Sequence, residues 1–192
     1  MRAESSDQSL LARLRAHDTA AFEDVFRAYY AELVRFANQY VEGRDDAEEL
    51  VAAMFAYLYD TLGRWEVRTT IRAYLFGSVR YRVFNHLRTT RRERRRHDLL
   101  FVDEQESVIP SPSVNPEELM MAEEDQRQRL HAVARAIAHL PPRARLVLSL
   151  RWTNQMSFDE IADVLDISPA AVQMQLSRAM RALREIAPEY LR

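Results

Sequence analysis

The sequence predicts an all-α protein with two small helical domains, residues 8–96 and 127–190, joined by residues 97–126, which form a flexible acidic linker and the start of a helix. Apolar residues recur at three- and four-residue spacing in both halves, and no convincing alternating strand pattern is present. Glycine occurs only three times in 192 residues, which disfavours turn-dense β folds. Residues 107–116 hold three prolines and three serines without a helical or strand period, which indicates a linker.

Three helices are predicted in the first half. The first begins at an N-cap residue, Asp18, and its apolar face comprises Phe22, Val25, Phe26, Tyr29, Leu33 and Val34. The second covers residues 46–62 between two glycines, with Asp45 as its cap and acidic residues in its first turns, where the helix dipole favours them. The third opens at the threonine pair 69–70 and reaches an arginine run at residues 91–96.

In the second half, Asn115 and Pro116 form a helix N-terminus, because a capping residue is followed by proline at the first helical position. The proline pair at residues 141–142 breaks that helix and starts the next, which extends to about Trp152. These signals predict two further helices before the C-terminal motif.

The C-terminal motif has the pattern of a helix-turn-helix. Ser157 and Glu160 form a capping box, residues 166–168 form a tight turn, and Pro169 follows a capping Ser168 at the start of the second helix. A helix of this kind can enter the major groove, where amide, hydroxyl and guanidinium groups read base edges. An ordinary helical hairpin with a solvated face is the alternative. The residues predicted to contact DNA here are Ser168, Gln173, Met174, Gln175, Ser177, Arg178 and Arg181.

Net charge is strongly uneven along the chain. The total is −2, but residues 1–60 carry −6, residues 61–96 carry +9, residues 97–126 carry −9 and residues 127–192 carry +4. Such asymmetry indicates partners rather than a fold. The total alone argues against a nucleic-acid binder, whereas the distribution favours one.

The basic segment, residues 61–96, interleaves arginines with aromatic residues. This pattern suits binding to a DNA strand that is partly single-stranded. Packing of the aromatic residues in the core is the alternative; it is favoured for Tyr74 and left open for Trp65. The residues predicted to contact DNA in this segment are Arg64, Trp65, Arg68, Arg72, Arg80, Tyr81 and Arg88.

Residues 46–59 resemble the DAEDLVQEVFLRLW helix of the extracytoplasmic-function (ECF, group IV) class within the sigma-70 family of bacterial RNA polymerase initiation factors. Residues 72–88 resemble the following segment of that family, which melts and reads the −10 element. The Leu-Pro-Pro-Arg-Ala-Arg run at 140–145 and the motifs within 160–179 resemble its region 4. The matches run in order along nearly the whole chain, with the linker in place of region 3.

The resemblance implies a factor that directs core RNA polymerase to promoters. It implies contacts with the β′ clamp helices and the β flap, recognition of −10 and −35 promoter DNA, and regulation by an anti-sigma factor. The acidic linker would thread the RNA exit path. The residues that the resemblance implies for binding of core polymerase are Asp46, Glu48, Glu49, Leu50 and Phe55.

A stand-alone helix-turn-helix regulator, with the N-terminal helices as a dimerisation or sensor domain, remains the alternative. An enzyme is disfavoured because the five histidines lack metal-ligand spacing, there is no phosphate loop, and cysteine is absent. We therefore expect no cofactor, no metal, no small-molecule substrate, no membrane insertion and a cytoplasmic location.

Overall fold

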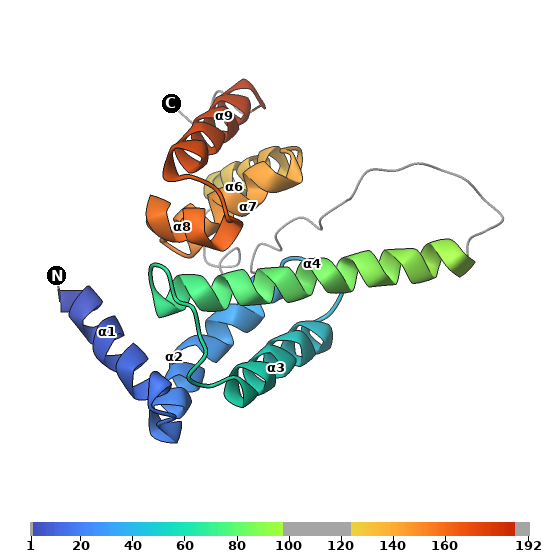
Figure 1. Ribbon diagram of the computed structural model, residues 1–192. Helices are drawn as coiled ribbons and strands as arrows, with labels where there is room; N and C mark the ends of the chain where they lie inside the picture. The colour runs from blue at the N-terminus through green and yellow to red at the C-terminus, as the bar shows by residue number, and fades with distance from the viewer. Residues whose placement is uncertain (1, 98–123, 187–192) are drawn as a thin grey trace. The chain divides into compact units, whose positions relative to one another are not determined.

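The structure is a computed structural model that describes residues 2–97 and 124–186. Every regular element within these two ranges is a helix, so the predicted all-α class is confirmed (Figure 1). Most of the predicted linker, including the helix start expected at Asn115, lies outside the described residues.

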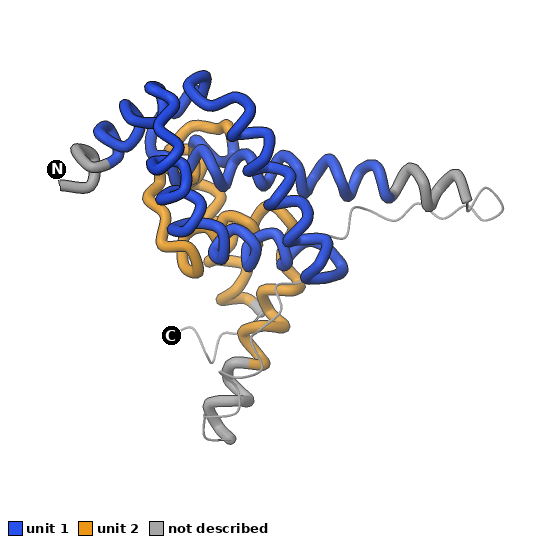
Figure 2. Tube along the Cα trace, turned by 90° about the horizontal axis from the view of Figure 1, so that it is seen from below, with its two compact units in different colours: residues 1–107, 163–165 blue, residues 108–162, 166–192 orange. Residues whose placement is uncertain are grey.

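The chain divides into two compact units. The first comprises residues 1–107 with 163–165, and the second comprises residues 108–162 with 166–192 (Figure 2). Each unit is helical and has buried apolar side chains of its own.

The described part of the first unit contains four helices, α1 (Arg2–Arg15), α2 (Thr19–Ala37), α3 (Arg44–Asp60) and α4 (Ile71–His97). Helices α2, α3 and α4 pack against one another, and α1 packs against α2. Helix α1 was not expected from the sequence. Its Leu14 is fully buried, and the run of leucines before it was the available signal. The core side chains that these helices share include Val25, Leu33, Phe36, Val51, Met54, Leu58, Ile71, Leu75, Phe76 and Val79.

Helix α4 begins with two side-chain caps. The hydroxyl oxygen of Thr70 accepts a hydrogen bond from the amide of Ala73 at 3.1 Å, which confirms the predicted start. The carboxylate of Asp7, on α1, accepts from the amide of Ile71 at 3.2 Å. Such side chains satisfy N–H groups that have no partner within the helix. The N-terminal helix therefore helps to fix the start of the basic helix.

The start of α3 differs from the prediction. Asp45 was expected as the cap, but Gly43 takes that position in extended backbone without a side-chain hydrogen bond, and Asp45 lies in the first turn. The helix gains its earlier start with Arg44, whose Nε donates to Glu48 one turn later at 2.7 Å. Asp45 and Asp46 still lie where negative charge is favourable to the helix dipole.

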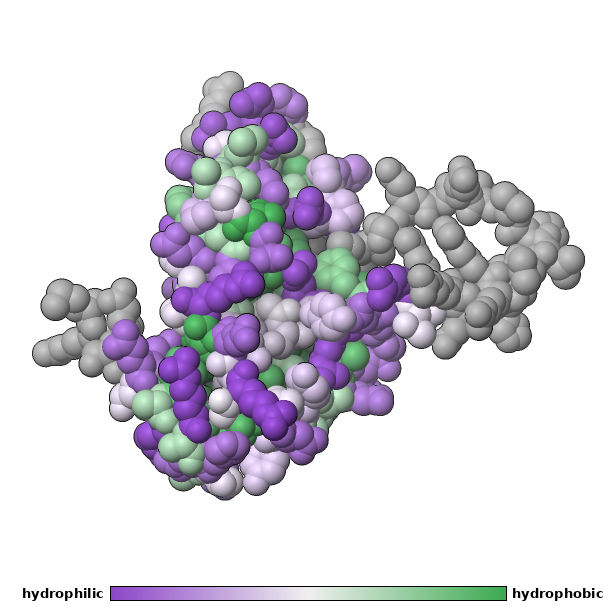
Figure 3. All heavy atoms as spheres, viewed as in Figure 1, coloured by the Kyte–Doolittle hydropathy of each residue, from purple (hydrophilic) through white to green (hydrophobic). Residues whose placement is uncertain are grey.

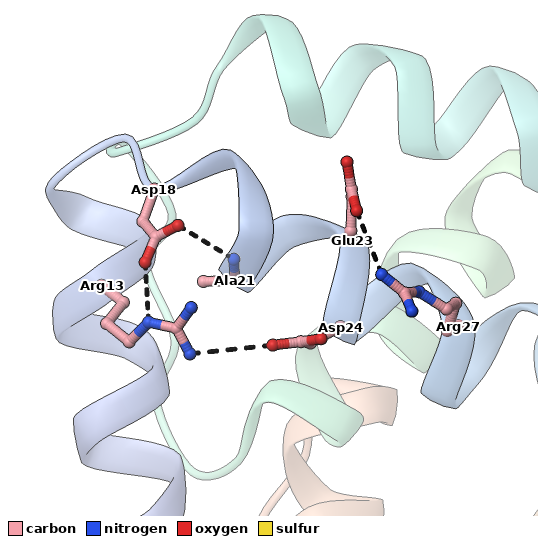
Figure 4. A network of polar contacts seen from close by, with 6 residues as sticks. All are labelled: Arg13, Asp18, Ala21, Glu23, Asp24 and Arg27. Atoms are coloured by element: carbon pink, nitrogen blue, oxygen red, sulfur yellow. Dashed lines mark hydrogen bonds and ion pairs between the residues drawn. The ribbon is translucent and has the colours of Figure 1, made fainter.

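Arg13 and Asp18 link α1 to the start of α2 (Figure 4). The Asp18 carboxylate accepts from Arg13 Nε at 2.7 Å and from the Ala21 amide at 3.2 Å, which confirms Asp18 as the cap. Arg13 also lies 3.7 Å from the carboxylate of Asp24. The hydrogen bond from Arg13, aided by that from Ala21, lowers the pKa of Asp18 below its ordinary value of 3.8.

This pairing predicts a dependence of stability on pH. Because the folded state lowers the pKa of Asp18, its contribution is present above the unfolded-state pKa and is lost as pH falls through the lower folded-state value. In Arg13→Ala, carboxyl NMR should show the Asp18 titration midpoint moving up towards 3.8. The stability lost in that variant at pH 6 should diminish at pH 3. An unchanged Asp18 midpoint would contradict this assignment. Arg27→Ala, which removes a more exposed pair with Glu23, is the matched control.

Apart from residues 163–165, the helices described after the linker belong to the second unit. They are α6 (Glu124–Ala138), α7 (Pro142–Leu148), the π-helical turn η1 (Ser149–Thr153), α8 (Phe158–Leu165) and α9 (Pro169–Ile186). The proline pair separates α6 from α7 as predicted, and Pro142 occupies the first turn of α7. Helix α9 packs against α6 and α7.

On the face drawn in Figure 3, hydrophilic side chains surround small hydrophobic patches. Among the residues that the structure describes, no helix combines the length and apolar character needed to cross a membrane.

Candidate nucleic-acid interface

Reciprocal side-chain caps define the helix-turn-helix, as the sequence predicts. The amide of Ser157 donates to Glu160 at 2.9 Å, and the amide of Glu160 donates to the Ser157 hydroxyl at 3.2 Å, which completes the capping box. The Ser168 hydroxyl accepts from the amide of Ala171 at 3.2 Å and caps α9, with Pro169 at its first position. Local chemistry therefore fixes where both helices begin.

Asp166 makes the turn between α8 and α9. Its φ of 54° is in the left-handed region, which aspartate tolerates better than most residues. The amide of Ile167 donates to the carbonyl oxygen of Ala162 at 3.0 Å, the six-to-one bond that closes a helix C-terminus. The turn is therefore tight without glycine.

Helix α9 has a buried face and an exposed face. Val172, Leu176, Ala179 and Leu183 recur at three- and four-residue spacing and are buried. The exposed members of the predicted DNA-contacting set lie on the other sides of the helix and are Ser168, Gln173, Met174, Ser177, Arg178 and Arg181. Gln175 is half-buried, and its amide oxygen is enclosed without a hydrogen-bond partner.

Helix α4 presents Tyr81 and Arg88 on one side. The Tyr81 ring is 67% exposed, and Arg88, two turns further on, is exposed and donates to the side-chain amide oxygen of Asn85 at 3.0 Å. Asn85 was not among the predicted contacts, although its spacing of four from Tyr81 was a signal that it shares this face. Arg64 and Arg68, on the loop before α4, are also exposed.

Two predicted arginines of α4 are only partly exposed. Arg72 forms an ion pair with Glu32 of α2, and its guanidinium lies 5.4 Å from the centre of the Phe76 ring. Arg80 is half-buried with its Nε enclosed. Arg72 and Arg80 therefore contribute less exposed charge to the surface of α4 than Arg88 does.

Trp65, predicted as a DNA contact with core packing left open, lies in the core. It is 4% exposed, and its indole N–H donates to the carbonyl oxygen of Leu58 at 3.0 Å. The ring stacks on Tyr74 at 5.6 Å and meets the edge of Phe22 at 6.1 Å. Burial raises the pKa of the Tyr74 phenol, with smaller contributions from Tyr57 and Glu66. Trp65 therefore anchors the loop that leads into α4.

Helix α3 buries one face and exposes an acidic one. Asp46 and Glu49 are exposed, and Leu50 beside them is half-buried. Further along the exposed face, alanines separate them from Asp60. The result is an acidic ridge formed by Asp46, Glu49 and Asp60, with the exposed ring of Tyr57 on the same face before Asp60.

Two residues predicted to bind polymerase have other partners. Phe55 is 3% exposed and meets the rings of Phe22 at 6.0 Å and Phe26 at 4.9 Å, so it packs in the core instead of lying on a docking surface. Glu48 is half-buried and pairs with Arg44. The apolar half of the predicted motif therefore maintains the fold, while Asp46 and Glu49 remain on the surface.

The fold and these surfaces define a class of protein: a two-unit helical DNA-binding protein with a C-terminal helix-turn-helix. Comparison with known families agrees. The chain matches sigma-70 region 2 over residues 25–93 and sigma-70 region 4 over residues 130–183.

Curated relatives match along nearly the whole chain. The ECF RNA polymerase sigma-E factor of Escherichia coli K12 is 25% identical over 182 residues, which cover 93% of this chain and 92% of that protein. The RNA polymerase sigma-H factor of Pseudomonas aeruginosa is 23% identical and covers 100% of this chain and 99% of its own. The chain belongs to the sigma-70 family and is an ECF RNA polymerase sigma factor, a transcription initiation factor and not an enzyme.

Solved structures share the fold. The sigma factor RpoE of Bartonella quintana, in complex with the anti-sigma factor NepR, has a TM-score of 0.62 at 20% identity, covering 88% of this chain and 97% of its own. CnrH, in complex with the cytosolic domain of CnrY, has a TM-score of 0.58 at 19% identity, covering 95% and 97%.

Proposed function

We propose that three surfaces of this sigma factor divide the work of initiation. The single observation that supports this most strongly is their separation by charge and exposure. An acidic ridge lies on α3, an exposed aromatic and cationic face lies on α4, and a polar, cationic face lies on α9. We assign residues 8–96 and 127–190 to the two functional domains, with residues 97–126 as their linker.

The α3 ridge binds core polymerase. Asp46 and Glu49 provide charge for a basic partner, for which the β′ clamp helices are the candidate, and Leu50 adds apolar contact. Complementary charges mainly raise association rates and specificity. The β flap is the candidate partner for the second domain.

The α4 face meets the −10 element. Tyr81 can stack on a base that has left the duplex, and Arg64, Arg68 and Arg88 can neutralise phosphates of the strand. Extruding a base costs about a few kcal/mol, which stacking of this kind offsets. The intra-unit pair between Arg72 and Glu32 holds α4 against α2 while this occurs.

Helix α9 reads the −35 element as duplex. Arg178 and Arg181 lie on its exposed face and can pair with guanine or with phosphate. Gln173 and Ser177 add polar groups beside them. We further expect a cytoplasmic location. We also expect regulation by an anti-sigma factor, because the similar RpoE structure contains one.

Reversing the charge of the α3 ridge tests the docking assignment. Asp46→Arg with Glu49→Arg should weaken binding to core polymerase about tenfold or more at low salt, with a smaller effect at high salt. Surface plasmon resonance on immobilised core enzyme measures this. Glu23→Arg, on the exposed side of α2, is the matched control and should bind as the wild type does. Unchanged binding of the double variant would show that core polymerase binds elsewhere.

A further inference from the structure

Met174 occupies an unusual place on α9. Successive helical residues turn by about 100°, which places Met174 directly opposite the buried stripe that contains Val172, Leu176 and Leu183. Its side chain is 53% exposed. Every other large hydrophobic side chain that stands exposed in the described parts of the chain is aromatic. The Met174 side chain therefore offers an exposed aliphatic group at the centre of this face for an apolar contact.

The neighbours of Met174 indicate duplex DNA as that partner. Arg178 lies one turn further along the same face, and Arg181 lies almost a turn beyond it. Ala170, one turn before Met174, is small and exposed. Two guanidinium groups beside a thioether suit a surface that is polyanionic at its edges and carries an isolated apolar group within it.

The major groove has such a group. Among the base edges exposed there, the C5 methyl of thymine is the apolar one, and apolar side chains recognise it. We infer that Met174 is a specificity-determining residue that packs its thioether against a thymine methyl in the −35 element. This inference rests on the proposed role of α9 as the −35 reader.

Removal of one methyl group from the DNA tests the inference. A promoter is first selected from a random-sequence duplex library with wild-type holoenzyme. Each thymine of its −35 element is then replaced by deoxyuridine, and holoenzyme affinity is measured. For the wild type, one replacement should weaken binding about fourfold, the factor expected for one buried methyl group. Met174→Ala should lose that sensitivity, and Met174→Leu should retain it.

The outcomes separate this inference from the proposed function. If wild-type holoenzyme selects no −35 sequence, the role of α9 is wrong. If it selects one that lacks thymine, or if every deoxyuridine replacement affects the wild type and Met174→Ala equally, the Met174 assignment alone is wrong. Weaker binding of Met174→Ala to core polymerase without DNA, with methyl sensitivity intact, would also overturn it, since Met174 would then contact protein.

Discussion

Replacing Arg178 and Arg181 together by alanine is expected to reduce promoter-specific initiation about a hundredfold or more. Both side chains are exposed on the face of α9 that lies opposite its buried stripe. A well-placed bidentate contact with a base contributes about 1–3 kcal/mol of discrimination, so loss of two such contacts accounts for an effect of this size. Initiation by reconstituted holoenzyme on a selected promoter provides the measurement.

The controls separate charge from recognition. Arg135→Ala removes an exposed arginine from α6 in the same unit and should leave initiation unchanged. Arg178→Lys keeps the charge but loses the planar fork, so specificity should fall more than non-specific DNA binding does. Circular dichroism should show that all variants keep their helical content. Normal initiation by the double alanine variant would exclude α9 as the −35 reader.

The second large effect concerns stability. Trp65→Ala should destabilise the protein by about 3–5 kcal/mol, the usual cost of truncating a large buried aromatic side chain. The residue is buried between Phe22 and Tyr74, and its N–H donates to Leu58. Trp65→Phe keeps much of the packing but loses the hydrogen bond, and should cost about 1–3 kcal/mol. Urea denaturation measures both.

The other tryptophan supplies the matched control. Trp152 is 54% exposed, so Trp152→Ala should change stability by less than about 0.5 kcal/mol. A Trp65→Ala variant as stable as the wild type, but defective in promoter opening, would return Trp65 to the DNA-contacting set and contradict its core assignment.

Local chemistry explains which parts of the fold were predictable. The capping side chains of Asp18, Thr70, Ser157 and Ser168 each accept a hydrogen bond from the amide three residues later. Such short-range patterns can be predicted from the sequence. The Asp166 turn belongs to the same category, because its cause is the conformational tolerance of one residue.

Long-range packing explains what the sequence did not reveal. Asp7 accepts a hydrogen bond from the amide of Ile71, 64 residues away, and the sequence around either residue does not predict this contact. Phe55 was expected on a binding surface and Trp65 was left open between the core and a DNA contact, yet both have tertiary neighbours that bury them. Helical spacing identifies a face but not which aromatic residues beside it the rest of the fold will cover.

The most direct test of promoter-directed initiation by this chain is run-off transcription on a linear template that carries the selected promoter. Core polymerase with the protein should give one transcript of defined length, and core polymerase alone should not. The protein without polymerase should show no comparable affinity for the same duplex in a gel shift. Tight, polymerase-independent binding of a dimer to a palindromic duplex, without a run-off product, would contradict the account.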